Sequence, residues 1–136
     1  MRLLPADSPR LGAILDVVHD PEQLWSGYGI RSLSKQDEFY GKDENYWRGP
    51  VWVNMNFLAL QSLQYYARTA GPYRLKAASM YKELRKDVVG NVYKEWERTG
   101  FAWEQYEQES GEAKGVQHFL GWTSLVVLMA SMPEFV

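Results

Sequence analysis

The sequence contains no cysteine and only two histidines in 136 residues. Without cysteine the chain cannot carry a disulfide scaffold, a cysteine-ligated zinc site or a thiol nucleophile. The histidines, His19 and His118, have no serine and acid partners that suggest a nucleophilic triad. A glycine-rich phosphate loop and the HExxH and CxxC metal spacings are also missing. The sequence therefore excludes several common catalytic designs.

The chain also lacks a strong charge of either sign and a long hydrophobic run. Fifteen Lys or Arg residues and seventeen Asp or Glu residues give a formal net charge of −2. Such a chain has no basic field to attract a phosphate backbone, so we expect no nucleic-acid partner. The longest strongly apolar run, Leu125 to Met129, is far shorter than the ~20 residues that span a bilayer. Pro5 and Asp7 come too early for the apolar core of a signal peptide, so we expect no direct membrane contact from this segment.

Apolar and aromatic side chains, in contrast, are abundant. The chain is 46% hydrophobic and includes six Trp and nine Tyr residues. This hydrophobic content excludes a disordered chain, and the length fits one domain of about 100–150 residues or part of a larger one. The aromatic residues allow two interpretations, a heavily aromatic core or a surface that binds sugars. Pyranose rings offer flat C–H faces to indoles and hydroxyls to carboxylates and Arg, but composition alone leaves both interpretations open.

Helical spacing and capping residues predict most of the secondary structure. Ser8-Pro9 is typical of a helix start, and apolar residues from Leu11 to Val18 follow at helical intervals. The other predicted helices are a short piece through Trp25, Pro50 to about Ala70, Pro72 to about Thr99 with Gly100 as its left-handed cap, and about Gly121 to Met132. Long ordered loops are predicted at residues 26–48 and 101–118. No segment alternates convincingly, so the sequence predicts an all-α fold.

The helix predicted from Pro50 is apolar on almost every side. A helix of this kind is buried on several faces, as in the inner layer of a larger helical assembly. Its neighbours in this chain are too few to cover those faces. We therefore expect that partner helices come from outside this chain, or that the chain oligomerises.

Two segments hold candidate site residues. The first, Glu44 to Trp52, places Arg48 at the start of the predicted inner helix, where a guanidinium can position carboxylates or sugar oxygens. The alternative is an ion pair of Arg48 with Glu44 or Asp43, with Trp47 and Trp52 in the core.

The second segment, Phe101 to Tyr106, contains Glu104 with aromatic residues on both sides. A carboxylate held among aromatic residues is a candidate general base. The alternative is a Glu104 that only pairs with Arg48. The run from His118 to Trp122 is a third possible wall of the site, although a lone histidine is more often structural.

Several motifs in these segments resemble glycoside hydrolase family 63, and most closely its eukaryotic branch. The motifs that carry the resemblance are Leu24 to Ser26, Tyr28 to Leu33, Tyr46 to Leu58, Gly71-Pro72, Val88 to Val92, Glu104 to Tyr106, and Gly121 to Val126. They occur in the family's order and cover nearly the whole chain.

The resemblance implies that residues 1–136 are the incomplete C-terminal part of an (α/α)₆ toroid, with inner and outer helix pairs and long active-site loops. It implies an inverting α-glucosidase that removes the terminal α-1,2-linked glucose from the triglucosylated N-glycan of nascent glycoproteins. It implies no metal and no organic cofactor. Residence on the lumenal side of the endoplasmic reticulum, through a membrane anchor upstream of this chain, is inferred from this kinship alone.

The resemblance also implies roles for individual residues. Glu104 corresponds to the general base, and His118 is a weaker match beside the Gly-Trp motif. The positions that map around the glucose pocket are Trp47, Arg48, Trp103, Tyr106 and Trp122. An inverting enzyme needs a second carboxyl group as general acid, about 6.5–9.5 Å from the base. The family's acid is an Asp in an upstream motif that has no match here, so we expect the isolated chain to be inactive.

Two alternatives stay open beside this hypothesis. One is a bacterial-type α-glycosidase of the same family that acts on small sugars. The other is a non-catalytic helical module that keeps an aromatic wall and binds sugar without hydrolysis.

Overall fold

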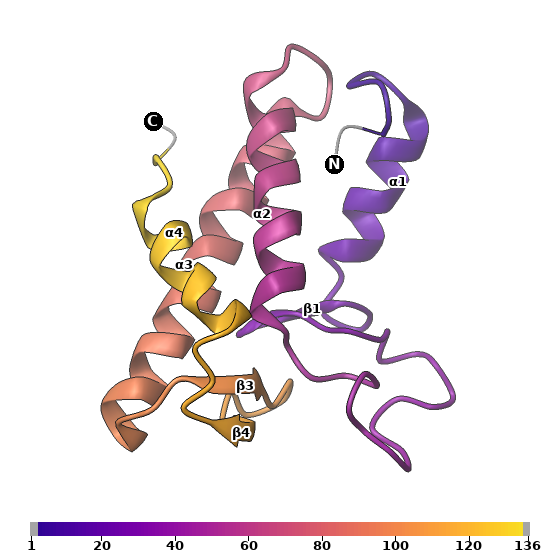
Figure 1. The fold of residues 1–136 in the computed structure, drawn as a ribbon. Coiled ribbons are helices and arrows are strands. Elements are labelled where there is room, and N and C mark those ends of the chain that lie inside the picture. The colour runs from indigo at the N-terminus through magenta and orange to yellow at the C-terminus, as the bar shows by residue number, and fades with distance from the viewer. Residues whose placement is uncertain (1–2, 135–136) are drawn as a thin grey trace.

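The computed structural model describes residues 3–134, which form four helices and two small sheets. The helices are α1 (Pro9–Val18), α2 (Val53–Arg68), α3 (Arg74–Thr99) and α4 (Leu125–Ser131), with a 3₁₀ turn at Trp122–Ser124. The strands are β1 (Trp25–Ser26), β2 (Gly29–Ile30), β3 (Trp103–Tyr106) and β4 (Ala113–Gln117). In Figure 1 the strands gather at one end of the helices, where α2 begins.

The core lies mainly between α2 and α3, which run in opposite directions (Figure 1). Val53 and Leu60 of α2 and Met80 and Leu84 of α3 are fully buried. As predicted, α1 begins at Pro9, and α3 ends at Gly100 in the left-handed conformation, with φ 80°. No helix within residues 3–134 combines the length and the apolar character needed to cross a membrane.

The expectation of an all-α fold is wrong in two places. The loop predicted at 101–118 is mostly a hairpin, in which β3 pairs with β4 in antiparallel register around a bulge between Trp103 and Gln105. Residues 104–106 are all buried, so the strand shows no alternation of buried and exposed residues that the sequence could reveal. β1 and β2 form a second, shorter antiparallel pair. The chain is therefore mostly helical with two small sheets.

Two predicted helix boundaries also change. Residues 21–24 form turns instead of a short helix. α2 begins at Val53 and not at Pro50, because Val51 bridges to Arg31 on one side and to Tyr106 on the other. The Val51 and Tyr106 backbones exchange two hydrogen bonds, of 2.8 and 3.0 Å. This bridge joins the start of α2 to the β3–β4 hairpin.

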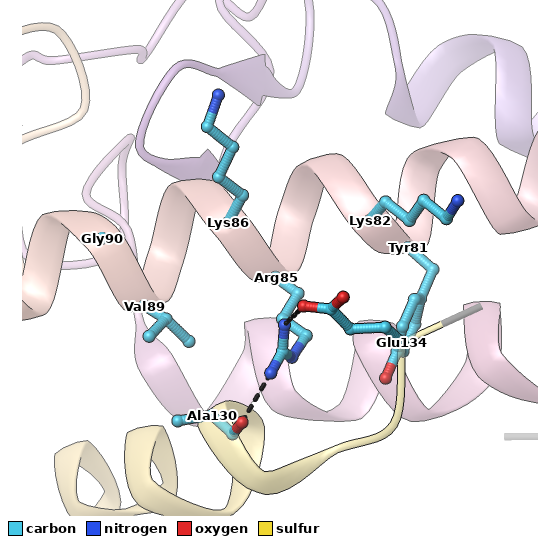
Figure 2. Close-up of a pocket in the computed structure, with 8 residues that line it drawn as sticks. All are labelled: Tyr81, Lys82, Arg85, Lys86, Val89, Gly90, Ala130 and Glu134. Atoms are coloured by element: carbon cyan, nitrogen blue, oxygen red, sulfur yellow. Dashed lines mark hydrogen bonds and ion pairs between the residues drawn. The ribbon is translucent and has the colours of Figure 1, made fainter. Parts of the chain in front are cut away.

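A guanidinium on α3 holds the end of α4 (Figure 2). Arg85 donates from Nε to the Met129 carbonyl at 2.9 Å, from Nη2 to the Ala130 carbonyl at 2.5 Å, and from Nη1 to Glu134 at 3.3 Å. These bonds satisfy carbonyls that the last turn of a helix leaves without partners. The role of Arg85 is thus to dock α4 on α3.

Apolar side chains remain exposed on both α2 and α4. Met55 and Leu58 of α2 are 52% and 43% exposed, and Val127 and Leu128 of α4 are 68% and 52% exposed. The described residues therefore leave these faces uncovered, as the composition of the α2 segment predicted.

Candidate active site

The Val51 bridge brings the two candidate segments together at the start of α2. The loop that ends at Trp52 lies against β3, and Glu104 on β3 faces residues of that loop. Two hydrogen bonds anchor β3 from the other side. The Trp122 indole donates to the Glu104 carbonyl at 3.2 Å, and the Thr123 hydroxyl donates to the Trp103 carbonyl at 2.6 Å.

The Glu104 carboxylate is the central polar group of the site. The residue is 8% exposed, and each of its carboxylate oxygens accepts one hydrogen bond. Oε1 accepts from the Tyr46 hydroxyl, and Oε2 accepts from the backbone N–H of Val116 at 3.3 Å. Gly115 lies so close that a Cβ there would be 2.7 Å from Oε2. A buried acid with these neighbours keeps a defined orientation.

An aromatic cluster forms the wall beside Glu104. Trp47 and Trp52 stack with 3.9 Å between ring centroids and 12° between planes. Tyr46 and Trp122 contact the Trp52 ring edge-on, at 4.8 and 5.5 Å. Trp52 is 1% exposed, whereas Trp47 is 47% exposed and presents a free ring surface. The cluster thus combines a core tryptophan with a surface one, so each of the two interpretations of the aromatic content is correct for part of it.

A cavity of about 300 Å³ opens next to this wall. Its lining residues are Glu44, Asn45, Tyr46, Gln105, Lys114 and Gly115. Two of them, Tyr46 and Gly115, also touch the Glu104 carboxylate. The buried acid therefore lies beside an opening lined by polar groups.

Arg48 is not where the charge argument placed it. Its guanidinium lies 3.4 Å from Asp43, 3.3 Å from the Lys42 carbonyl and 5.2 Å from the centre of the Phe39 ring. The expected pair of Arg48 with Glu104 is not formed between the described residues, and the alternative ion pair with Asp43 is confirmed. The donors to Glu104 are a phenol and a backbone N–H instead of a cation.

The other predicted site residues lie at varied distances from the wall. Trp103 donates its indole N–H to Thr99 at 2.9 Å, which ties β3 to the end of α3. Tyr106 is 1% exposed in the core, and burial raises its pKa to about 12. His118 is exposed after β4, with φ 58° and its ring edge-on to Phe101 at 4.2 Å. Glu104, Trp47 and Trp122 are thus brought together, whereas Tyr106 and His118 face elsewhere.

Tyr46 and Gly115 are contacts of Glu104 that the sequence analysis did not single out. Tyr46 stood next to Trp47 in a recognised motif, which gave a signal for its place but not for its partner. Its hydrogen bond to Glu104 is the main reason that the pKa of the Tyr46 hydroxyl is raised. Gly115 adopts φ 81°, which no sequence pattern in this segment predicted.

A second acidic group links the loop to the hairpin away from the aromatic wall. Glu109 accepts a hydrogen bond from Tyr40 and lies 3.4 Å from Arg31 and 3.8 Å from Lys35. Burial and the bond to Glu109 raise the pKa of Tyr40 to about 12. The bond from Tyr40 also contributes most to lowering the pKa of Glu109. This network fixes the long loop on the turn between β3 and β4.

Comparison with known proteins gives relatives across nearly the whole chain. It is 53% identical over 130 residues to the probable mannosyl-oligosaccharide glucosidase of Schizosaccharomyces pombe. It is 42% identical over 132 residues to the mannosyl-oligosaccharide glucosidase of Saccharomyces cerevisiae, and 44% over 135 residues to that of Arabidopsis thaliana. These matches cover 93–96% of this chain but 16% of each relative, so the chain spans about a sixth of their length.

Solved structures and a family model agree with these relatives. The fold resembles that of the GH63 mannosylglycerate hydrolase from Thermus thermophilus in its complex with Tris, with a TM-score of 0.65 at 23% identity. That likeness covers 90% of this chain and 26% of the hydrolase. The model of the glycosyl hydrolase family 63 C-terminal domain matches residues 1–132. The resemblance inferred from the motifs is therefore confirmed, and the chain belongs to glycosyl hydrolase family 63.

Proposed function

We propose that this chain is the C-terminal part of the (α/α)₆ catalytic domain of a mannosyl-oligosaccharide glucosidase, with Glu104 as its general base. Identity of 42–53% to three relatives of that name supports the activity. The observation that carries the site is the Glu104 carboxylate, buried beside an aromatic wall and held by two donors. The complete protein that contains this chain is called the full-length enzyme below.

The proposed reaction is an inverting hydrolysis of the terminal α-1,2-linked glucose of a triglucosylated N-glycan. Glu104, in its ionised form, takes a proton from a water molecule, and that water attacks the anomeric carbon. A carboxylic acid from outside this chain protonates the departing glycan oxygen. The bond from the anomeric carbon to that oxygen breaks as the new C–O bond forms on the opposite face. No metal or organic cofactor takes part in this scheme.

Trp47 and Trp122 are the aromatic residues that we expect to contact the sugar. Trp47 is half exposed and stacked on a buried indole, so its outer face is available to the C–H face of a pyranose ring. Trp122 contacts Trp52 and hydrogen-bonds the Glu104 carbonyl. For Arg48, Trp103, Tyr106 and His118, substrate binding stays a prediction from their motif positions.

The physiological setting follows from the same proposal. The substrate is the glucosylated high-mannose N-glycan of nascent glycoproteins, in the lumen of the endoplasmic reticulum. The remainder of the catalytic domain supplies the general acid and the missing helices. We propose no nucleic-acid partner.

A substrate comparison with the full-length enzyme tests this function. We expect release of β-glucose from triglucosylated glycan, detected by NMR before the anomers equilibrate, and much slower hydrolysis of small glycosides. The small-sugar alternative has its own support, because the mannosylglycerate hydrolase of Thermus thermophilus is 31% identical over 101 residues. Activity confined to small glycosides would favour that alternative, and sugar binding without hydrolysis would favour a non-catalytic module.

A further inference from the structure

We propose that Tyr46 is a positioning residue for Glu104, whose hydroxyl fixes the orientation of the carboxylate that accepts the proton from water. The inference deepens the proposed function and rests on it, because it concerns the same carboxylate. It assigns to Tyr46 a role through another residue rather than a contact with the reacting atoms.

The hydrogen bonds of Glu104 show how its orientation is fixed. One donor serves each oxygen, and the donors come from segments 58 and 12 residues away along the chain. An ionised carboxylate has about four lone-pair sites, so two bonds leave acceptor capacity for a water molecule. The Val116 N–H belongs to the paired strand β4, whereas the Tyr46 hydroxyl comes from a loop. Of the two donors, the phenol is the one that a substitution can remove.

The loop holds the Tyr46 ring although much of the residue is exposed. The ring packs edge-on against Trp52 at 4.8 Å and against Trp47 at 5.9 Å, and Trp52 is itself in the core. The bond to Glu104 raises the pKa of the phenol, so the hydroxyl stays protonated and remains a donor at neutral pH. The phenol is therefore anchored by the aromatic wall and directed at the base.

The test compares two tyrosines of the same loop in the full-length enzyme. Tyr46→Phe removes the donor to Glu104, and Tyr40→Phe removes the equivalent donor to Glu109, outside the site. We expect Tyr46→Phe to lower kcat about 10- to 100-fold, as for the loss of a hydrogen bond to a charged group, with KM within about twofold. The acid limb of the kcat–pH profile moves to higher pH, because the ionised carboxylate loses a donor. Tyr40→Phe leaves kcat within about twofold.

The other outcomes separate the inference from the proposed function. Wild-type kcat in Tyr46→Phe, or an equal loss in both variants, would overturn the positioning role. A rise in KM alone would make Tyr46 a substrate contact and would also overturn it. Glu104→Gln is assayed in parallel. If that variant turns over normally, the proposed function fails. If it is inactive while Tyr46→Phe is normal, only the inference fails.

Discussion

At the scale of single residues, Gly115 decides how closely β4 passes over the Glu104 carboxylate. Its φ of 81° already costs a non-glycine residue about 1–2 kcal/mol. In Gly115→Ala the added Cβ would lie 2.7 Å from Oε2, the end of a flexible side chain, so the carboxylate must turn away. We expect the full-length variant to fold and to lose about tenfold or more in kcat.

Gly41 offers a matched control for the backbone strain of that variant. It has φ 66° and open space where a Cβ would stand. Gly41→Ala should therefore lower the melting temperature by a similar amount and keep kcat near the wild-type value. Equal kcat in the two variants would show that Gly115 has no bearing on Glu104.

Little of this residue-scale detail could be predicted from the sequence. The motif around Glu104 identified the acid, and the neighbouring tryptophans indicated an aromatic wall. The donors to the acid were beyond reach, because they depend on a bridge between Val51 and Tyr106 that pairs residues 55 positions apart. The charge argument for Arg48 failed for a related reason, since Asp43 in its own loop supplies a nearer partner.

At the scale of elements, Glu95 attaches the β3–β4 hairpin to α3. Glu95 is 2% exposed, and its Oε2 accepts from the Ala113 N–H at 2.8 Å and from Arg98 at 2.6 Å. The hydrogen bond from Arg98 is the largest cause of the lowered pKa of this carboxyl. The hairpin that presents Glu104 is thus anchored at the start of its second strand.

Glu95→Gln should weaken this anchor and change how stability depends on pH. We expect a loss of about 1–3 kcal/mol in unfolding free energy at pH 7, measured by denaturant titration. Because the folded pKa lies below the unfolded one, the wild-type stabilisation is present above the unfolded pKa of about 4.3 and is lost as pH falls through the folded pKa. The two proteins should therefore converge in strongly acidic solution. Glu38→Gln, at an exposed acid, is the control, and an equal effect there would contradict the anchoring role.

The elements themselves were predicted unevenly. Helical periodicity and the Pro and Gly boundaries gave α1, α2 and α3 almost as they are. The hairpin was missed because Glu104, Gln105 and Tyr106 are all buried, which removes the alternation that marks a half-buried strand. Leu128 was expected to be buried in the last helix and is half exposed.

At the scale of the whole molecule, the exposed apolar faces and the single site carboxylate have a common explanation. Met55 and Leu58 lie on the helix that the proposal assigns to the inner layer of the toroid, and their exposure leaves a face for further helices. The chain spans 16% of its relatives' length, so most of the proposed catalytic domain lies outside it. The general acid belongs to that remainder.

The isolated 136-residue chain should accordingly release no measurable glucose from triglucosylated glycan. Without an acid the leaving glycan oxygen departs unprotonated, and general acid catalysis typically contributes 10²–10⁴-fold to the rate. The full-length enzyme, assayed at equal molar concentration, is the reference. Glucose release by pure isolated chain would show that the site is complete within these residues.

The most direct measurement of the central claim is turnover by Glu104→Gln in the full-length enzyme, next to binding of the same glycan. The amide keeps the shape of the side chain but cannot accept the proton from water. We predict a kcat at least about 10³-fold lower, with a Kd for the glycan within severalfold of the wild-type value. Glu112→Gln, at an exposed acid of the same hairpin, should remain fully active. Wild-type turnover by Glu104→Gln would contradict the assignment of this carboxylate as the base.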